Sequence, residues 1–236
     1  MSDGKEYALK KVTMDSLSTK EKQNALNEVR ILASINHPAI IGYKEAFIDS
    51  GKFLCIVMNY ATDGDLFQKI TASRKSKELI SEEQAWKIVL GAVAGLAKLH
   101  QLNIFHRDIK SANIFLRADG SALLGDLNVS KVAKGGLLYT QTGTPYYASP
   151  EVWNDTPYDS KSDIWSLGCV LYETLSLYPP FRAQDMNALY KKVIKGTFED
   201  PPGIYSRDLK RMINSMLVVK SDLRPSCEQI INCREL

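Results

Sequence analysis

The chain has 236 residues, a length that suits a two-lobed domain, and its hydrophobic fraction of 44% and charged fraction of 24% predict a packed core. A net charge of +3, mixed along the chain, is too weak to indicate nucleic-acid binding. The longest apolar stretch, residues 164–177, is too short for a membrane span and contains Glu173, so we expect neither a membrane nor a nucleic acid as a partner.

The first 58 residues predict strands arranged around one helix. Residues 7–12, 43–48 and 53–58 have the composition of short strands, bounded by turn residues. Between the first two strands, Ser18 and Glu21 form the capping-box pattern with which a helix begins. This part of the chain is therefore expected to form a small lobe built on a sheet.

The pattern becomes helical after residues 59–62, which we interpret as a hinge. Ser81 and Gln84 begin a long helix, and further helices are predicted at residues 160–176, 183–195 and 206–218 and from residue 226 onward. Residues 103–150 are predicted to form short strands and loops. The predicted fold class is α+β: one domain over residues 1–236, with a partial N-terminal lobe (1–58), the hinge (59–62) and a helical C-terminal lobe (63–236).

Residues 106–113 read His-Arg-Asp-Ile-Lys-Ser-Ala-Asn and carry the strongest chemical signal in the chain. Phosphoryl transfer needs metal ions held by oxygen ligands, a cation near the phosphates and a group that orients the attacking hydroxyl. Asp108 can orient that hydroxyl or accept its proton, and Lys110 can neutralise charge on the γ-phosphate. Asn113 can offer an amide oxygen to magnesium. We expect His106 to pack beneath the site and not to act as a base.

Three residues outside this loop complete the set of groups that phosphoryl transfer requires. Lys10, at the end of the first strand, would contact the α- and β-phosphates, with Glu28 as its ionic partner; considered alone, Lys10 is better explained as a surface lysine. Asp126, in Gly-Asp-Leu-Asn, would chelate magnesium across the phosphates. Asn128 in that motif belongs to a residue type that tolerates left-handed backbone, so a turn at this position does not require glycine.

Two carboxylates are predicted to have structural roles. Glu151 ends the segment 140–151, which reads Thr-Gln-Thr-Gly-Thr-Pro-Tyr-Tyr-Ala-Ser-Pro-Glu, and could pair with Arg224 to fasten that segment to the helical lobe. Asp163 is expected to hold the backbone of the loop at 106–113.

Together these motifs resemble the eukaryotic protein kinase superfamily over essentially the whole chain. Lys110 and Thr144 resemble the serine/threonine branch. Residues 113–116, 143–147 with 149–151, and 162–169 are similar to the NIMA-related kinases within that branch. The resemblance implies a two-lobed kinase fold, ATP and Mg²⁺ as cofactors, and serine or threonine hydroxyls of protein substrates as acceptors.

The resemblance also assigns a nucleotide site. Met58 would be the gatekeeper, and the backbone of Asn59 and Ala61 would bind adenine. Ala8 and Phe115 would enclose the adenine ring, although Phe115 is almost as well explained as a core residue.

Further roles concern ribose, regulation and the acceptor peptide. Asp65 would either reach the ribose or cap the next helix, and the sequence does not decide between the two. Thr140 resembles an activating phosphosite whose charge would pair with Arg107. Thr144 begins a platform for the substrate peptide.

A glycine-rich loop that would cover the phosphates is not found in the sequence. We therefore expect a truncated N-terminal lobe, either because the chain is a fragment or because the protein lacks this lid, and weak ATP binding in consequence. The alternative to an enzyme is a pseudokinase-like scaffold, but such a scaffold would have no need for Lys10, Asp108 and Asp126 together. The family resemblance implies a cytoplasmic location associated with the cytoskeleton or the cilium.

Overall fold

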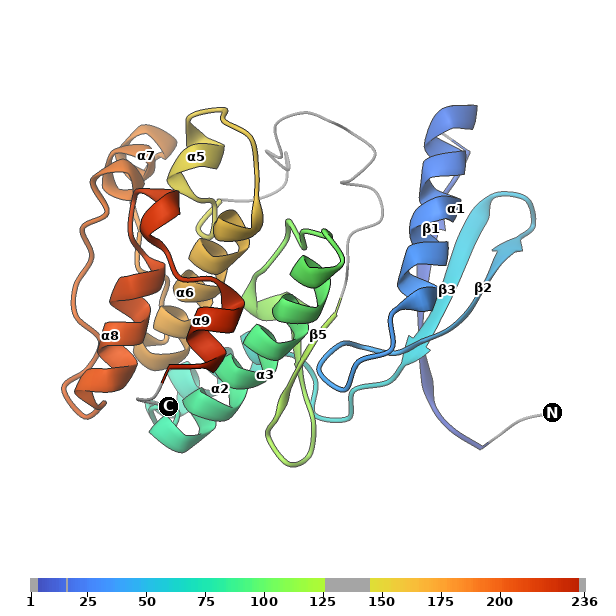
Figure 1. The fold of residues 1–236 in the computed structure, drawn as a ribbon. Helices are drawn as coiled ribbons and strands as arrows, with labels where there is room; N and C mark the ends of the chain where they lie inside the picture. Colours follow the sequence, from blue (N-terminus) through green and yellow to red (C-terminus); the bar gives the residue numbers. More distant parts are fainter. Residues whose placement is uncertain (1–3, 16, 126–144, 234–236) are drawn as a thin grey trace.

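The computed structural model describes residues 4–15, 17–125 and 145–233, and within these ranges it divides into two lobes (Figure 1). A sheet with one helix beside it forms the N-terminal lobe, and a bundle of helices forms the C-terminal lobe. The mixed helix and sheet content confirms the predicted fold class.

The N-terminal lobe contains β1 (Tyr7–Thr13), α1 (Thr19–Ser34), β2 (Tyr43–Asp49) and β3 (Phe53–Asn59). The strands are antiparallel in the order β1-β3-β2, so the sheet has the three strands that the sequence predicts. The predicted capping box is present at the start of α1. Apolar side chains of α1 and β3 pack together with Met14 to form the core of this lobe.

The C-terminal lobe is built around α6 (Ser160–Ser176), which is buried along almost its whole length. The other helices of this lobe are α2 (Leu66–Ser76), α3 (Glu82–Gln101), the short α5 (Pro150–Trp153), α7 (Met186–Lys195), α8 (Arg207–Met216) and α9 (Cys227–Ile231). The predicted helices are thus present, with shifted ends. For example, α7 begins at Met186 and not at residue 183, because the Asp185 side chain accepts a hydrogen bond from the Ala188 N–H (2.8 Å) and so fixes the start of the helix.

A small hairpin, β4 (Ile114–Leu116) with β5 (Ala122–Leu124), lies where the two lobes meet (Figure 1). The Ile41 N–H donates to the Leu124 carbonyl (2.8 Å), and the Leu124 N–H donates to the Ala39 carbonyl (2.9 Å). The segment that leads into β2 is therefore hydrogen-bonded to the strand that leads into residue 125. These hydrogen bonds hold the two lobes together at the base of the space between them.

Within the described residues, no helix combines the length and the apolar character needed to cross a bilayer. All four cysteines are free thiols.

Candidate active site

The loop at residues 106–113 is held from below by one buried carboxylate. Asp163 accepts hydrogen bonds from the backbone N–H groups of His106 (2.9 Å) and Arg107 (3.0 Å), and its Oδ2 lies 2.9 Å from His100 Nε2. The Tyr158 hydroxyl donates to the same carboxylate. Although burial opposes ionisation, the hydrogen bond from His100 and the charge of His106 hold the pKa of Asp163 below its usual value. The predicted structural role of Asp163 is confirmed.

Arg107 has a left-handed backbone conformation, with a φ of 62°. A non-glycine residue adopts that conformation at a cost, and it persists only where surrounding contacts impose it. The bond from its N–H to Asp163 is such a contact. His106 occupies the predicted position beneath the site, where its Nε2 donates to the Gly125 carbonyl (3.0 Å).

Asp108, Lys110 and Asn113 meet on the upper side of the loop. Lys110 Nζ lies 3.0 Å from Asp108 Oδ2, and the Asn113 side-chain nitrogen donates to the Asp108 carbonyl (2.8 Å) and to Asp108 Oδ2 (3.0 Å). A short 3₁₀ turn, η1 (Ser111–Asn113), brings Asn113 back to Asp108. The Asn113 carbonyl accepts a bond from the Gly125 N–H (3.0 Å), so the loop is also tied to the residue before Asp126.

A cavity of about 430 Å³ opens between the lobes. Its volume lies within the range of small-molecule sites. The residues that line it include almost the whole predicted nucleotide set: Ala8, Lys10, Met58, Asn59, Ala61, Asp65 and Phe115, together with Asn113. Ile41, Gly64 and Gln68 also line it and were not predicted, because no motif distinguishes them from ordinary core and turn residues.

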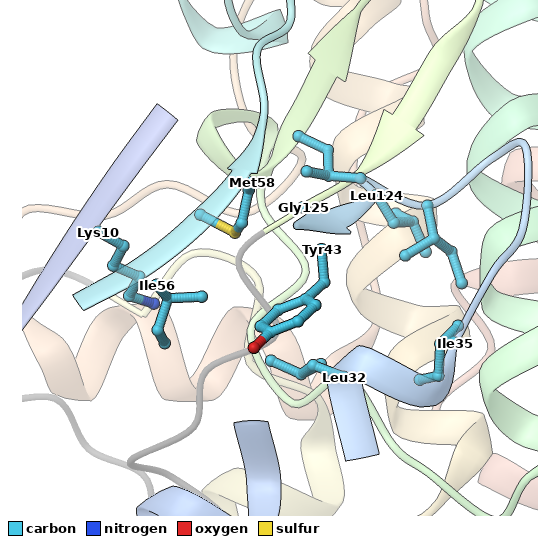
Figure 2. Close-up of a pocket in the computed structure, with 10 residues that line it drawn as sticks. Lys10, Leu32, Ile35, Tyr43, Ile56, Met58, Leu124 and Gly125 are labelled. Carbon is cyan, nitrogen blue, oxygen red and sulfur yellow. The ribbon is translucent and has the colours of Figure 1, made fainter. Parts of the chain in front are cut away.

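Met58 lies between this cavity and a second, smaller one. The second cavity encloses about 30 Å³, enough for water and too little for a nucleotide. In Figure 2, Lys10 and Ile56 lie on one side of it and Leu32 and Ile35 on the other, while the Tyr43 ring lies beside Leu32. Lys10 and Met58 line both cavities, and the roles predicted for them as phosphate-binding lysine and gatekeeper stay predictions.

The backbone at the hinge narrows the choice of adenine partners. The Asn59 N–H donates to the Gly42 carbonyl (2.8 Å), so the carbonyl of Asn59 and the N–H of Ala61 are the groups that an adenine ring would use. Asp65 caps α2 by accepting a bond from the Gln68 N–H (2.8 Å). It also lines the cavity, so capping and a contact with ribose are compatible.

The backbone of Gly125 approaches Phe115 closely. A Cβ added to Gly125 would lie 2.4 Å from Phe115 Cε2 and 3.0 Å from Ile41 Cδ1. Only glycine fits here without moving the ring that lines the cavity. The predicted sites Asp126, Thr140 and Thr144 lie outside the described residues, as does the side chain of Glu28, so its pairing with Lys10 stays a prediction.

Glu151 and Arg224 form the predicted ion pair, with Nη1–Oε1 and Nη2–Oε2 distances of 2.7 and 2.8 Å. The Arg224 side chain is fully buried and makes three more bonds, to the carbonyls of Val218, Lys161 and Val219. All five guanidinium donors are therefore used. Although burial opposes its ionisation, bonds from Arg224 and Ser162 lower the pKa of Glu151 below its usual value.

One buried polar network was not predicted. The Tyr147 hydroxyl donates to Glu173 Oε2 (2.7 Å) and lies 3.1 Å from Ser111 Oγ. Burial raises the pKa of Glu173. This network connects Tyr147 to α6 and to the residue after Lys110, but its members come from three distant parts of the sequence and form no motif.

The residues present fit the chemistry of a magnesium nucleotide. The Asn113 nitrogen is used by Asp108, so its amide oxygen remains for a hard cation, which prefers oxygen ligands. The cavity offers apolar walls, hinge backbone groups and the Lys10 ammonium in one space.

A family model described as protein kinase domain matches residues 1–234. The chain therefore belongs to the protein kinase family, as its sequence motifs and its two-lobed fold indicate. Its curated relatives are named as Nek serine/threonine-protein kinases, in agreement with the resemblance to the NIMA-related kinases that the sequence motifs carry.

Those relatives include the serine/threonine-protein kinase Nek1 of Mus musculus, 40% identical over 97% of this chain and 19% of the relative. The serine/threonine-protein kinase Nek2 of Homo sapiens is 37% identical over 98% of this chain and 54% of its own length. The probable serine/threonine-protein kinase nek3 of Dictyostelium discoideum is 40% identical over 98% of this chain and 21% of its own length. The chain thus spans between about a fifth and about half of the length of these three relatives.

Proposed function

We propose that the protein transfers the γ-phosphoryl group of ATP to serine or threonine hydroxyls of protein substrates. One observation carries the proposal: the cavity between the lobes is lined by the predicted adenine set and also by Lys10 and Asn113. Asn113 in turn is hydrogen-bonded to Asp108, which contacts Lys110. Groups for holding the nucleotide and groups for the transfer therefore form one continuous site.

ATP would lie with its adenine between Ala8 and Phe115. Residues 59–62 would act as the hinge, with the Asn59 carbonyl accepting a bond from the adenine amino group and the Ala61 N–H donating to the ring. Met58 would close the rear of the site, and Asp65 would lie on the ribose side.

The Lys10 ammonium would contact the α- and β-phosphates, with Glu28 as its ionic partner. Asn113 and Asp126 would hold the magnesium ion. When bound, that ion supplies positive charge that neutralises the phosphate oxygens as charge develops on them.

In the transfer itself, the acceptor hydroxyl oxygen forms a bond to the γ-phosphorus while the bond from that phosphorus to the bridging oxygen of ADP breaks. The hydroxyl proton passes to the Asp108 carboxylate. The Lys110 ammonium, 3.0 Å from that carboxylate, is near enough to the reacting centre to neutralise charge on the moving phosphoryl group. The Asn113 amide, bonded to the same carboxylate, fixes its orientation.

Regulation and substrate binding belong to the same proposal. Phosphorylation of Thr140 would add charge that pairs with Arg107, and Thr144 would support the acceptor peptide. Proteins with exposed serine or threonine are the proposed partners, and neither nucleic acid nor a membrane is. A cytoplasmic location near the cytoskeleton or the cilium follows from the family resemblance.

The test is phosphate transfer from labelled ATP to a general protein acceptor such as casein. Asp108→Asn keeps the shape of the side chain and should lower the rate about a hundredfold or more, because the proton acceptor is lost. Asp222→Ala, at an exposed aspartate of η2 (Ser221–Leu223), is the matched control and should leave the rate unchanged. Equal rates for wild type and Asp108→Asn would contradict the assigned roles.

Thermal unfolding with Mg-ATP distinguishes an enzyme from a scaffold. A ligand that binds the folded state must raise the apparent stability. An absence of stabilisation at millimolar nucleotide, together with an absence of labelling, would favour the scaffold.

A further inference from the structure

Two arginines and one tyrosine gather where α2 meets the end of α6. The Arg74 guanidinium carbon lies 4.3 Å from the centre of the Tyr178 ring, and that of Arg182 lies 4.6 Å from the same centre. Arg74 also donates from Nε to the Leu177 carbonyl (3.0 Å). We refer to Arg74, Tyr178 and Arg182 as the arginine cluster.

The positive charge of the arginine cluster is not balanced by a carboxylate at ion-pair distance within the described part of the chain. Lys192 Nζ donates to the Arg182 carbonyl (2.7 Å), which adds a third cation at the same place. None of these three side chains makes an ion pair with a described residue. Arg182 is exposed to solvent.

Structural roles explain Arg74 and Lys192 but leave the charge of Arg182 unexplained. Arg74 lies in the last turn of α2 and Lys192 in the last turn of α7, where cations interact favourably with the helix dipole. Arg182 precedes α7, and its guanidinium makes no hydrogen bond with a described residue. Its fork of donors, whose central carbon lies 4.6 Å from the centre of the Tyr178 ring, is suited to binding a carboxylate or a phosphate with two parallel bonds.

A chain of contacts connects the arginine cluster to the catalytic loop. Burial raises the pKa of the Glu173 carboxyl group, and the positive charge of Arg74 acts in the opposite direction, so the two side chains are close. Glu173 binds the Tyr147 hydroxyl, which lies 3.1 Å from Ser111 Oγ. The helix α2 itself packs against both η1 and α6. The catalytic loop and the arginine cluster are therefore both attached to α2 and α6.

We infer that the arginine cluster is a docking subsite for an anionic side chain of the substrate polypeptide. That side chain belongs to a residue several positions before or after the acceptor in the substrate sequence. The inference rests on the proposed function. The ligand chemistry is a carboxylate or a phosphorylated serine, and the second, with about twice the charge, should bind more strongly.

Peptides with one serine acceptor test the subsite. Aspartate, phosphoserine, alanine or lysine is placed at successive positions on both sides of the acceptor. Phosphorylation kinetics and the fluorescence anisotropy of labelled peptides are then measured with the purified protein. At the position that reaches the arginine cluster, aspartate should lower KM and Kd about two- to fivefold relative to alanine, the range of exposed ion pairs. The preference should disappear at about 1 M salt, where the screening length is about 3 Å.

Variants of Arg182 decide whether the cluster is responsible. Arg182→Gln should abolish the aspartate preference, and Arg182→Glu should reverse it in favour of the lysine peptide. Lys220→Glu makes the same charge change at an exposed cation outside the cluster and should keep the wild-type preference. A preference that survives Arg182→Gln, or equal affinity for aspartate and alanine peptides at every position, would overturn the inference.

Failure of the proposed function would look different from failure of the subsite. Labelling of alanine and aspartate peptides with equal efficiency would leave the kinase activity standing and remove the subsite. Binding of the acidic peptides without any labelling would support the subsite and overturn the proposed activity.

Discussion

Replacing Asp163 with asparagine exchanges one carboxylate oxygen for an amide nitrogen. We expect this substitution to disturb the backbone of the catalytic loop strongly. The carboxylate accepts the N–H groups of His106 and Arg107, contacts His100 and binds the Tyr158 hydroxyl. Its side chain is fully buried. Asparagine keeps the shape but has one acceptor oxygen in place of two, so its amide nitrogen must face a group that the carboxylate formerly bound.

The contacts set the size of the effect. If the remaining oxygen stays with Arg107, the buried His106 N–H loses its acceptor, which costs about 1–3 kcal/mol, and a charge-assisted bond worth about 1.5–3 kcal/mol is lost with it. Removal of a buried negative charge recovers part of this through desolvation. We therefore expect a net loss of about 2–4 kcal/mol in the free energy of unfolding.

Activity should fall as well, because the loop backbone carries Asp108 two residues after His106. Arg107, with its left-handed φ of 62°, is held there by a bond to the same carboxylate. A displacement of about 1 Å at a catalytic group lowers rates about a hundredfold. Urea unfolding and the kcat for a protein acceptor measure the two effects. Tyr158→Phe, which removes one bond and leaves both backbone bonds, is the control and should lose about 1 kcal/mol. An Asp163→Asn variant whose stability and kcat match those of Tyr158→Phe would refute the assignment.

Three further predictions follow from buried contacts. Glu151→Gln leaves the Arg224 guanidinium buried without its counter-charge and should lower the free energy of unfolding by about 3–5 kcal/mol in urea titrations. The pKa of Glu151 is lowered in the folded state, so its contribution is complete above its unfolded pKa of about 4.3 and is lost as the pH falls through the folded value. The stability gap between wild type and Glu151→Gln should therefore narrow on acidification below about pH 4.3, and a constant gap would contradict this account. Gly125→Ala should raise the KM for ATP about tenfold, since its Cβ would displace the Phe115 ring, whereas Gly203→Ala, with nothing within 4 Å, should have no effect in the same assay.

Contacts between residues that are close in sequence, or that stand in recognisable motifs, could be predicted from the sequence. Asp108 and Asn113 are five positions apart, and the 3₁₀ turn between them makes their contact a local property of the chain. The pairing of Glu151 with Arg224 joins distant segments, yet it was predictable because both residues stand in recognisable motifs. Helix beginnings with a side-chain cap were also predictable, as at Ser18.

Other features could not be predicted because they depend on tertiary packing. Ile41 lines the cavity between the lobes, where its backbone N–H pairs with the Leu124 carbonyl across the lobes. The approach of Gly125 to Phe115 reflects the register of a hairpin with three residues in each strand, which no local pattern specifies. The arginine cluster joins α2 to the segment after α6, and its members are ordinary surface cations when each is considered separately.

The helix α6 shows why the catalytic loop and the segment around Tyr147 hold a fixed relation to each other. Nearly every side chain of this helix is buried, and a helix in such surroundings would be most stable if it were apolar throughout. Yet Asp163, Ser166 and Glu173 lie at spacings of three and seven residues, which places them along one face. Asp163 holds the catalytic loop, while Ser166 Oγ lies 2.8 Å from the Tyr147 carbonyl and Glu173 binds the Tyr147 hydroxyl. Because both segments are bonded to one helix, that helix sets the distance between the catalytic loop and Tyr147, and a mutation along this face should affect catalysis more than its loss of stability alone would explain.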